Sequence, residues 1–460
     1  MLAVLPFENL TGDPAQEYFS DGLTEEMISR LGNLDPQRLG VIARTSVARF
    51  KRTREPLDRL ARELGVQYVL EGSVRRSGDR VRIAAQLIQV SDQTHLWARQ
   101  YDRELRSLLA VQEEIAQAVA REIQISLADR RDGSVPDSEL SSASYEAYDL
   151  YLKGRYFWNK RTPEGFRQAA EHFQRAVEKD PAYARAYAGL ADSYALMSSY
   201  SMGPATELIP RARSAALRAL ELDDHLAEAH TSLALIHENF DWDWQSAEKE
   251  FRRAIQLDPN YATAHQWYAE FLAFQGRFDE ALAESERAGQ LDPLSLIIAV
   301  DRGAILYWAR RYDRAIEQLR SVLAIDPNFP RARIIIAPYL AKGMFKEALA
   351  EADRWREQDD SPWPWLAYVE IYGRWGRLAE ARKAFERFKH ENRGSRIQSA
   401  PAMSAAYVSL GDKEKALDWL EQAYREHSNA MTGLKVEPGC DPLRNEPRFQ
   451  ELLRLVHLDR

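Results

Sequence analysis

Two neighbouring stretches of the sequence decide the fold, because they repeat each other without a gap. Residues 262–293 read ATAHQWYAEFLAFQGRFDEALAESERAGQLDP, and residues 296–327 read LIIAVDRGAILYWARRYDRAIEQLRSVLAIDP. Pro259, Pro293 and Pro327 follow one another at equal steps along the chain. A period of about 34 residues with small side chains at fixed places predicts an array of helix–turn–helix repeats.

The spacing of residue types within one repeat has a physical reason. Two antiparallel helices are expected, each with apolar residues at positions i, i+3, i+4 and i+7. The small side chains of Ala281 and Ala288 lie on one face of the second helix and let the two helices approach closely. Gly276 stands where the first helix should end with a positive φ. Asp292 should end the second helix, because a residue before proline avoids the α region.

These residues resemble the tetratricopeptide repeat family, and about eight such repeats fit residues 145–427. The sixth repeat is one residue short and has Pro338 inside its first helix, which predicts a kink there. One repeat cannot bury its apolar face alone, so neighbouring repeats must stack. The last segment, 428–460, contains DPLRNEPRFQELLRLVHL and is expected to cap the final exposed apolar face.

Residues 1–128 have a different pattern, in which short apolar runs alternate with amphipathic helices. In the run 80–90 the apolar residues Val81, Ile83, Ala85 and Leu87 alternate with polar ones, which predicts a strand with one buried face. The sequence RSGD at 76–79 predicts a hairpin turn. The expected strands are 1–7, 38–44, 66–74, 80–90 and 95–103, and the expected helices are 17–34, 56–65 and 108–127. Residues 1–128 are therefore expected to form an α/β domain.

The exact sequence of residues 1–128 points to one family more specifically than the order of strands and helices does. AVLPFENLTGDPAQEYFSDGLTEEMISRL, VIARTS, ARELGVQYVLEGSVRRSGDRVRIAAQLI and HLWARQYDREL resemble the TolB-like amino-terminal domain of many bacterial signalling proteins. The resemblance covers nearly all of 1–128 and implies a mixed sheet. TolB itself continues into a β-propeller, whereas this chain continues into helical repeats, so TolB's periplasmic location and partners are not carried over. A polar, serine-rich linker is expected at 129–144.

The composition of the chain disfavours some classes of function and some cellular locations. The chain has 460 residues and a formal charge of −8, which disfavours nucleic-acid binding. No apolar run is long enough for a transmembrane helix, and the short run after Met1 lacks a basic leader. These features predict a cytoplasmic protein with no membrane segment, or a periplasmic one if the native chain has an amino-terminal extension.

The sequence shows no motif of catalysis, cofactor binding or metal binding. A glycine-rich phosphate loop, GxSxG and HExxH are all missing. His225 and His230 lack the spacing of metal ligands, while Asp223 and Asp224 are interpreted as turn and cap residues. Cys440 is the one cysteine, and no neighbouring residue suggests that its thiol is activated. The chain is therefore expected to be no enzyme and to hold no cofactor.

A partner-binding groove follows from the tetratricopeptide resemblance, which implies that the first helix of each repeat lines a concave surface. Tyr307 and Trp308 are two aromatics in this set and suggest an anchor for a protein or peptide partner. The alternative is that they pack against the neighbouring repeat. Family members that hold carboxylate-ended peptides use repeated Lys, Arg and Asn at these positions, and this chain does not. The implied groove residues are Thr231, Leu235, Gln266, Glu270, Phe274, Val300, Ala304, Tyr307, Trp308, Ile334, Glu370 and Arg374.

Two basic clusters stand in the first domain. They are Arg49, Lys51, Arg52 and Arg54, and Arg75, Arg76 and Arg80. Each is interpreted either as a solvated surface or as a docking face for an acidic partner or another domain.

Two functions remain open. The first is a non-enzymatic scaffold that binds partner proteins in bacterial signalling. The second is the carboxyl-terminal regulatory part of a longer protein, because in the family this pair of domains often follows a winged-helix regulator, a class III adenylate cyclase or a serine/threonine kinase domain.

Overall fold

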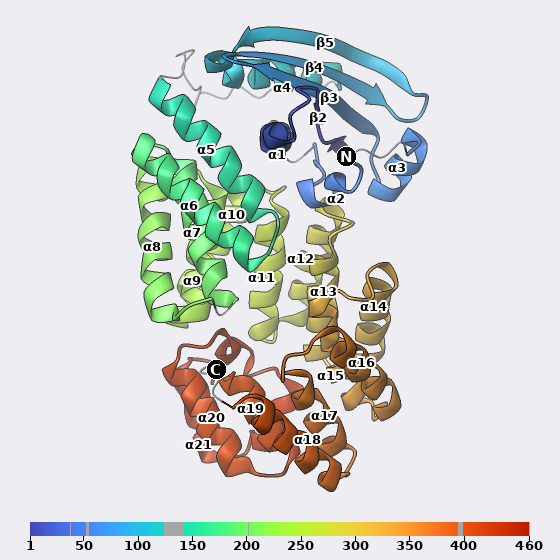
Figure 1. Cartoon of the computed structure of the whole chain (residues 1–460), viewed down its shortest axis with the longest axis vertical. Helices are drawn as coiled ribbons and strands as arrows, with labels where there is room; N and C mark the ends of the chain where they lie inside the picture. Colours follow the sequence, from blue (N-terminus) through green and yellow to red (C-terminus); the bar gives the residue numbers. More distant parts are fainter. Residues whose placement is uncertain (37, 52–54, 124–141, 201, 394–398, 460) are drawn as a thin grey trace. The chain divides into compact units, whose positions relative to one another are not determined.

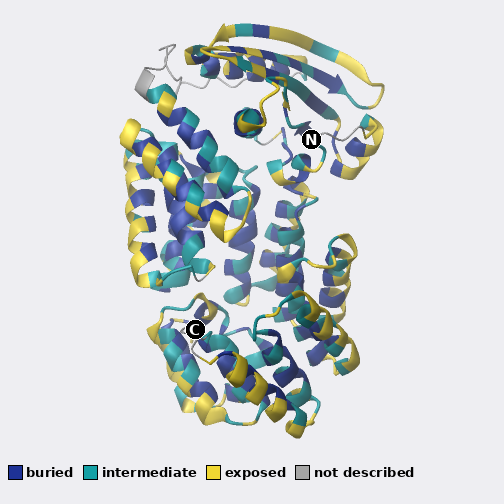
Figure 2. Cartoon of the chain, viewed as in Figure 1, coloured by how far each residue is buried: buried dark blue, intermediate teal, exposed yellow. Residues whose placement is uncertain are grey.

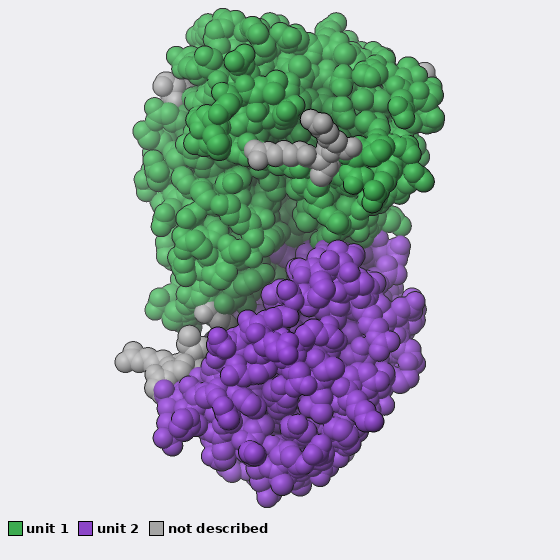
Figure 3. Space-filling view, turned by 45° about the vertical axis from the view of Figure 1, so that its right-hand side comes forward, with its two compact units in different colours: residues 1–236, 249–265, 287–295 green, residues 237–248, 266–286, 296–460 purple. Residues whose placement is uncertain are grey.

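The computed structural model describes residues 1–36, 38–51, 55–123, 142–200, 202–393 and 399–459. No helix in these ranges is long and apolar enough to cross a membrane. The chain forms two compact units, coloured separately in Figure 3. Unit 1 comprises residues 1–236, 249–265 and 287–295, and unit 2 comprises residues 237–248, 266–286 and 296–460.

The amino-terminal part of unit 1 is built on a mixed sheet, as the sequence predicted (Figure 1). Strands β1 and β2 run parallel to β3, while β3, β4 and β5 form an antiparallel meander. Gly78 has a φ of 56° in the tight turn between β3 and β4, where the hairpin was expected. The strands are β1 Leu2–Val4, β2 Glu8–Asn9, β3 Tyr68–Ser77, β4 Arg80–Gln89 and β5 Thr94–Glu104.

Helices pack on this sheet through residues that the sequence pattern identified. In β4 the side chains of Val81, Ile83, Ala85 and Leu87 are buried, and the residues between them are more exposed. The helix α1 buries Phe19, Leu23, Met27 and Leu31, at steps of four residues. The helices of this domain are α1 Glu17–Gly32, α2 Arg44–Ala48, α3 Leu57–Leu64 and α4 Leu108–Glu122.

The predicted strand at 38–44 is wrong. The structure has a single bridge there, between Leu2 and Val41, and α2 starts at Arg44. The Ile42 N–H still donates to the carbonyl of Leu2 in the sheet, at 2.9 Å, but the following amide does not. The Ala43 N–H donates to the carbonyl of Leu291, 2.7 Å away, at a repeat junction of the same unit. The chain therefore turns away from the sheet after one bridge.

The rest of the chain consists of helical hairpins, and α10, α11 and α12 contribute residues to both units. The helices up to that point are α5 Ser142–Trp158, α6 Pro163–Lys179, α7 Ala184–Ser199, α8 Ala205–Leu222 and α9 Ala227–Ile236. A π-helical turn, His237–Asp241, extends α9. The next helices are α10 Trp244–Leu257, α11 Ala262–Phe274, α12 Phe278–Leu291, α13 Leu296–Trp308 and α14 Tyr312–Ile325.

The carboxyl-terminal half of unit 2 continues the hairpins. Its α-helices are α15 Ile336–Ala341, α16 Phe345–Gln358, α17 Pro364–Arg374, α18 Leu378–Glu391, α19 Ala400–Ser409, α20 Lys413–Arg425 and α21 Pro447–Leu455. Three short 3₁₀ helices are η4 Pro330–Ile335, η5 Asn429–Gly433 and η6 Pro438–Leu443. Met431, Leu434 and Leu443 join the apolar core formed by α20 and α21. The segment 428–460 thus buries apolar side chains against the last hairpin.

The turns inside the hairpins keep the repeat register. Gly276 has a φ of 81°, as predicted, and Arg310, at the same place in the next repeat, has a φ of 60°. Gly376 and Gly411 hold the same conformation, with φ of 79° and 80°. Just before Pro338 the structure has a break between two short helices in place of the predicted kink within one helix. The chain runs as the 3₁₀ helix η4 up to Ile335, and Pro338 lies in the first turn of α15, where a missing N–H costs little.

The alanines of the repeat are packed as the spacing required. Ala281 on α12 has no exposed surface, whereas Ala283, two residues along the same helix, is exposed. Ala281→Leu is therefore expected to overpack the helix contact and to lower the unfolding free energy by about 1–3 kcal/mol. Ala283→Leu is the matched control and should change it by less than about 0.5 kcal/mol. Urea unfolding of both variants checks this, and equal midpoints would show that the register is wrong.

Within unit 1 the amino-terminal domain is bound directly to the repeats. Tyr18 Oη and Arg76 Nη1 both donate to Asp149 Oδ1 on α5, at 2.7 and 3.0 Å. Asn260 Nδ2 donates to the carbonyls of Gly32 and Leu39, at 2.9 and 3.0 Å. Contacts to α5 and to a later repeat junction thus hold the domain against the array.

The domain boundaries at 128, 144 and 427 stay a prediction. Most of the expected linker at 129–144 lies outside the described residues, and α5 begins at Ser142, within its last three residues.

Candidate partner-binding surface

The predicted groove residues from Gln266 onward belong to unit 2 and come from four elements. Both α11 and α13 are buried over much of their length (Figure 2). Helix α11 carries Gln266, Glu270 and Phe274, helix α13 carries Val300, Ala304, Tyr307 and Trp308, η4 carries Ile334, and α17 carries Glu370 and Arg374. Gln266, Val300, Ala304 and Tyr307 are buried, Arg374 is exposed, and the others are half-buried. Thr231 and Leu235 lie in α9, in unit 1.

The aromatic residues of this set contact the chain's own carboxyl-terminal segment. Tyr307 Oη donates to Glu437 Oε1 at 2.7 Å, and Trp308 Nε1 donates to Glu437 Oε2 at 3.1 Å. The Phe274 ring lies 4.9 Å from the Trp308 ring, and its edge would lie 3.6 Å from a methyl group added at Gly433. The two aromatics therefore do not pack only against the next repeat, and they do not stand free. They hold residues 433–437.

A second contact holds Asp441, four residues beyond Glu437. Arg310, in the turn after α13, donates through Nη1 and Nη2 to the two carboxylate oxygens of Asp441, at 2.6 and 2.7 Å. Sequence reasoning identified the aromatics but missed Glu437 and Asp441. The contacts join residues about 130 positions apart in the chain, so no local pattern could have shown them.

Glu370 and Arg374 lie one turn apart on α17, near the same segment. Burial is the main cause that raises the pKa of Glu370 to about 7, with Arg374 lowering it and Glu437 raising it. The folded carboxyl therefore keeps its proton well above its ordinary pKa of 4.5, the value taken for the unfolded chain.

This difference predicts a pH dependence of stability. The folded state binds more protons than the unfolded state between pH 4.5 and about 7, so this contribution to stability falls as the pH rises through that window. Glu370→Gln should remove that part of the slope and raise the unfolding free energy above pH 7. Urea unfolding across this pH range measures the slope, with the exposed Glu317→Gln as control. An unchanged slope in Glu370→Gln would contradict the assignment.

A second polar group, called here the carboxylate cluster, consists of Glu238, Glu270 and Asp301. Gln266 Nε2 donates to Asp301 Oδ2 at 2.6 Å, which orients that carboxylate. Arg331 Nη2 lies 3.1 Å from Asp301 Oδ1 and 3.7 Å from Glu270 Oε1. Burial raises the pKa of both Glu270 and Asp301, the charge of Asp301 raises that of Glu270 further, and Arg331 opposes the shift.

The basic clusters of the first domain are used within unit 1. Lys51 pairs with Glu17 and Asp21, Arg76 with Asp149, and Arg80 with Asp102. The pairing of Arg76 with α5 matches the interpretation of a docking face for another domain. Arg52 and Arg54 lie outside the described residues.

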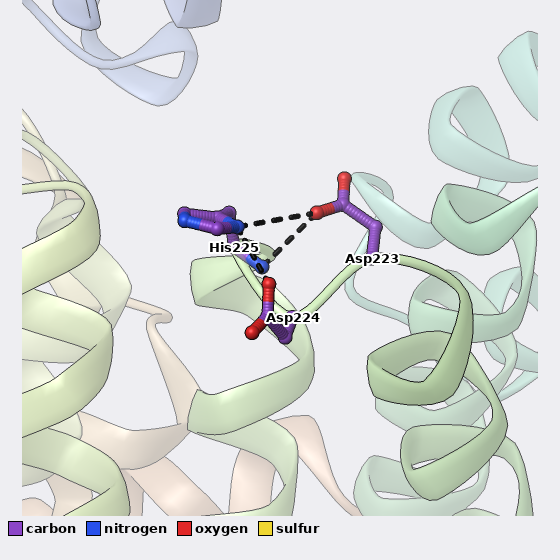
Figure 4. Close-up of side chains that lie close together, drawn as sticks. All are labelled: Asp223, Asp224 and His225. Carbon is purple, nitrogen blue, oxygen red and sulfur yellow. Dashed lines mark hydrogen bonds and ion pairs between the residues drawn. The ribbon is translucent and has the colours of Figure 1, made fainter. Parts of the chain in front are cut away.

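The structure also places the acidic turn at residues 223–225 and the single cysteine, Cys440. Asp223, Asp224 and His225 are exposed, and one carboxylate oxygen or ring nitrogen from each lies within 4.8 Å of the others (Figure 4). Asp223 Oδ1 accepts the His225 backbone N–H at 3.0 Å, so the aspartate serves the turn after α8, as predicted. Burial is the main cause that raises the pKa of the Cys440 thiol to about 12, which leaves little thiolate at neutral pH.

Comparison with protein families matches three parts of the chain. Residues 151–200 and 243–299 match tetratricopeptide repeat families, and residues 1–118 match the family described as the HilA/YgeH-like transcriptional regulator, second domain. The match at 1–118 is thus to a HilA-like domain rather than to TolB.

Similar curated proteins are longer than the matched region. "Putative adenylate cyclase 3" of Rhizobium meliloti is 36% identical over 240 residues, which cover 51% of this chain and 39% of that protein. Transcriptional regulator HilA of Salmonella typhimurium is 25% identical over 327 residues, which cover 70% of this chain and 56% of that protein. The chain spans about two fifths and just over half of these relatives.

Solved structures that match parts of this chain share little sequence with it. A thermophilic tetratricopeptide repeat protein of Thermus thermophilus is 17% identical, with a TM-score of 0.35, and covers 41% of this chain and 95% of its own. Human IFIT1 is 14% identical, with a TM-score of 0.45, and covers 69% and 79%. The family matches show tetratricopeptide repeats at residues 151–200 and 243–299, and they show that residues 1–118 are similar to the second domain of HilA-type regulators.

Proposed function

We propose that the chain is a non-enzymatic scaffold whose tetratricopeptide repeats bind a partner protein through the first-helix surface of unit 2. The observation that carries this proposal is the set of buried and half-buried carboxylates on that surface. Glu270, Asp301 and Glu370 all have pKa values raised mainly by burial. Such groups weaken the fold, and perturbed carboxyls gathered on one surface mark candidate functional sites.

The proposal assigns different roles to the two ends of the predicted groove. Phe274, Tyr307 and Trp308 hold the carboxyl-terminal segment through Gly433 and Glu437. The partner surface is then made by the half-buried Glu270, Ile334 and Glu370 and the exposed Arg374, while the buried Gln266 and Val300 support these residues from the core.

A photo-cross-linking residue at position 334 tests this surface. Ile334 is half-buried on η4, so a probe there should reach a partner bound across α11 and α13. The matched control places the same probe at exposed Glu317, on the second helix α14. Cross-linking in the native cell should give a discrete protein adduct at position 334 and none at position 317. Equal labelling at both positions, or none at 334, would count against the scaffold surface.

The second candidate is that these residues are the regulatory part of a longer signalling protein. The similarity to a protein named as an adenylate cyclase and to the HilA regulator supports it. The TolB-like resemblance of residues 1–128 and a place in bacterial signalling belong to this proposal, as does a cytoplasmic location. Mapping the native transcript and its upstream reading frame tests it. An in-frame cyclase, kinase or winged-helix domain would support the candidate, and a stop codon directly upstream would exclude it.

We further propose that residues 1–460 bind no nucleic acid themselves, even though a relative is a transcriptional regulator. The formal charge of −8 opposes contact with phosphates. A gel-shift titration at low salt checks this, and binding to mixed-sequence DNA by the 460-residue chain would contradict it.

A further inference from the structure

The carboxylate cluster contains one acid that the fold itself leaves without a partner. Glu238 lies in the π-helical turn His237–Asp241 and is only 2% exposed. Among the described residues, none donates a hydrogen bond to its carboxylate or forms an ion pair with it. Burial raises the pKa of Glu238 well above its ordinary value, and the charge of Glu270 raises it further. A buried carboxylate with no partner costs stability, so its presence calls for a reason.

The backbone at Glu238 is also unusual. An α-helical first helix would continue from α9, but the chain here takes a π-helical turn of five residues. Turns of this kind are rare and occur often at functional sites. The local geometry thus gives an independent sign that Glu238 is placed for a purpose other than packing.

Among the described residues, the cluster holds more acidic side chains than basic ones. Glu238, Glu270 and Asp301 are three acids, and Arg331 is the cation that approaches two of them. The guanidinium of Arg331 is half exposed, and Glu270 keeps about a fifth of its side chain in contact with solvent. A cationic group entering beside Glu270 would find one further carboxyl, Glu238, with which no described residue is paired.

We propose that the carboxylate cluster receives a lysine or arginine side chain from a basic segment of the partner protein. The proposal rests on the proposed function and names the chemistry of its partner. Among the described residues, these three carboxylates do not bring ligand atoms within 4.8 Å of one another, as a single metal ion would need. A guanidinium, with five N–H donors in a planar fork, can instead bridge separated oxygens.

The test uses two peptides that differ only in charge. One is acetyl-Gly-Arg repeated three times with a carboxyl-terminal amide, and the other has citrulline, the uncharged isostere, in place of arginine. Calorimetric titration at low ionic strength should show binding of the arginine peptide and none of the citrulline peptide. Glu238→Gln should weaken binding at least tenfold, which is about 1.4 kcal/mol. The control Glu317→Gln removes the same charge from an exposed position and should change binding less than twofold.

A second readout separates binding from folding. Glu238→Gln replaces an unpaired acid with a neutral isostere, so its melting temperature at pH 8 should equal or exceed that of the native chain while its affinity falls. Glu270→Gln provides an independent variant and should also lose affinity. Equal affinity of Glu238→Gln and Glu317→Gln, or equal binding of both peptides, would overturn the cation site. An adduct at position 334 together with that result would leave the scaffold function standing with a partner of other chemistry.

Discussion

Replacing Phe173 with alanine is expected to lower the unfolding free energy of the first repeats by about 3–5 kcal/mol. The Phe173 ring on α6 has no exposed surface and lies between Gly154 of α5 and Gly189 of α7. A methyl group added at either glycine would come within 2.5 Å of a ring atom. Three helices therefore meet around this ring, and its removal leaves a cavity that they cannot close without giving up other contacts. Urea unfolding and hydrogen exchange of the α5–α7 amides measure the loss.

The two glycines supply an internal control for that prediction. Gly189→Ala alone should destabilise by about 1–3 kcal/mol, because the new methyl group overlaps the ring. In a Phe173→Leu background the same change should cost much less, because leucine has no atom where the ring edge was. If the two effects add to within about 0.5 kcal/mol, the ring and the glycine are not in contact and the packing is wrong.

Replacing Arg155 with methionine is expected to cost about 3 kcal/mol, because it leaves an acid without its cation. Arg155 Nε donates to Glu25 Oε1 at 2.8 Å, and Asn159 Nδ2 donates to Glu25 Oε2 at 2.8 Å. The side chains of Arg155 and Glu25 are only 12% and 19% exposed. Burial alone would raise the pKa of Glu25, but Arg155 and Arg44 outweigh it and lower that pKa. The pair joins α5 of the repeats to α1 of the amino-terminal domain.

Three measurements make this prediction specific. The double variant Glu25→Met with Arg155→Met should recover most of the loss, because it removes both charges at once. The single variant should regain stability as the pH falls, because Glu25 then takes up a proton and no longer needs a cation. Arg167→Met, at an exposed i,i+3 pair with Glu164, is the control and should cost less than about 1 kcal/mol. A loss in Arg155→Met no larger than in Arg167→Met would mean that the pair does not hold the domain.

The amino-terminal domain shows which strands can be predicted from local sequence patterns and which cannot. The alternation Val81, Ile83, Ala85 in β4 predicted a strand with one buried face, because side chains alternate regardless of what covers the sheet. The same reasoning failed at 38–44, where the apolar run is just as strand-like. There the Ala43 amide donates to Leu291, which belongs to a distant repeat, and no local rule contains that partner.

The candidate site, too, was predicted in part from local sequence patterns and in part could be seen only in the folded chain. The repeat register placed Gln266 and Glu270 on α11 and Tyr307 and Trp308 on α13, because helix periodicity decides which residues share a face. It did not show that Glu437 would occupy the two aromatics, nor that Glu238 would be buried without a partner. Those facts depend on where a distant segment and a π-helical turn come to lie.

The sequence by itself determined the architecture: a mixed-sheet domain, then helical hairpins whose regular period follows from small residues at close contacts and from proline after several of the second helices. Only the tertiary structure decided what those surfaces do. The amino-terminal domain sits on α5 and on repeat junctions, and the carboxyl-terminal segment takes the aromatic end of the predicted groove. The physical reason is the distance along the chain over which each kind of interaction acts. Periodicity and turn chemistry act over a few residues, whereas ion pairs and buried charges are set by elements that meet only once the chain has folded.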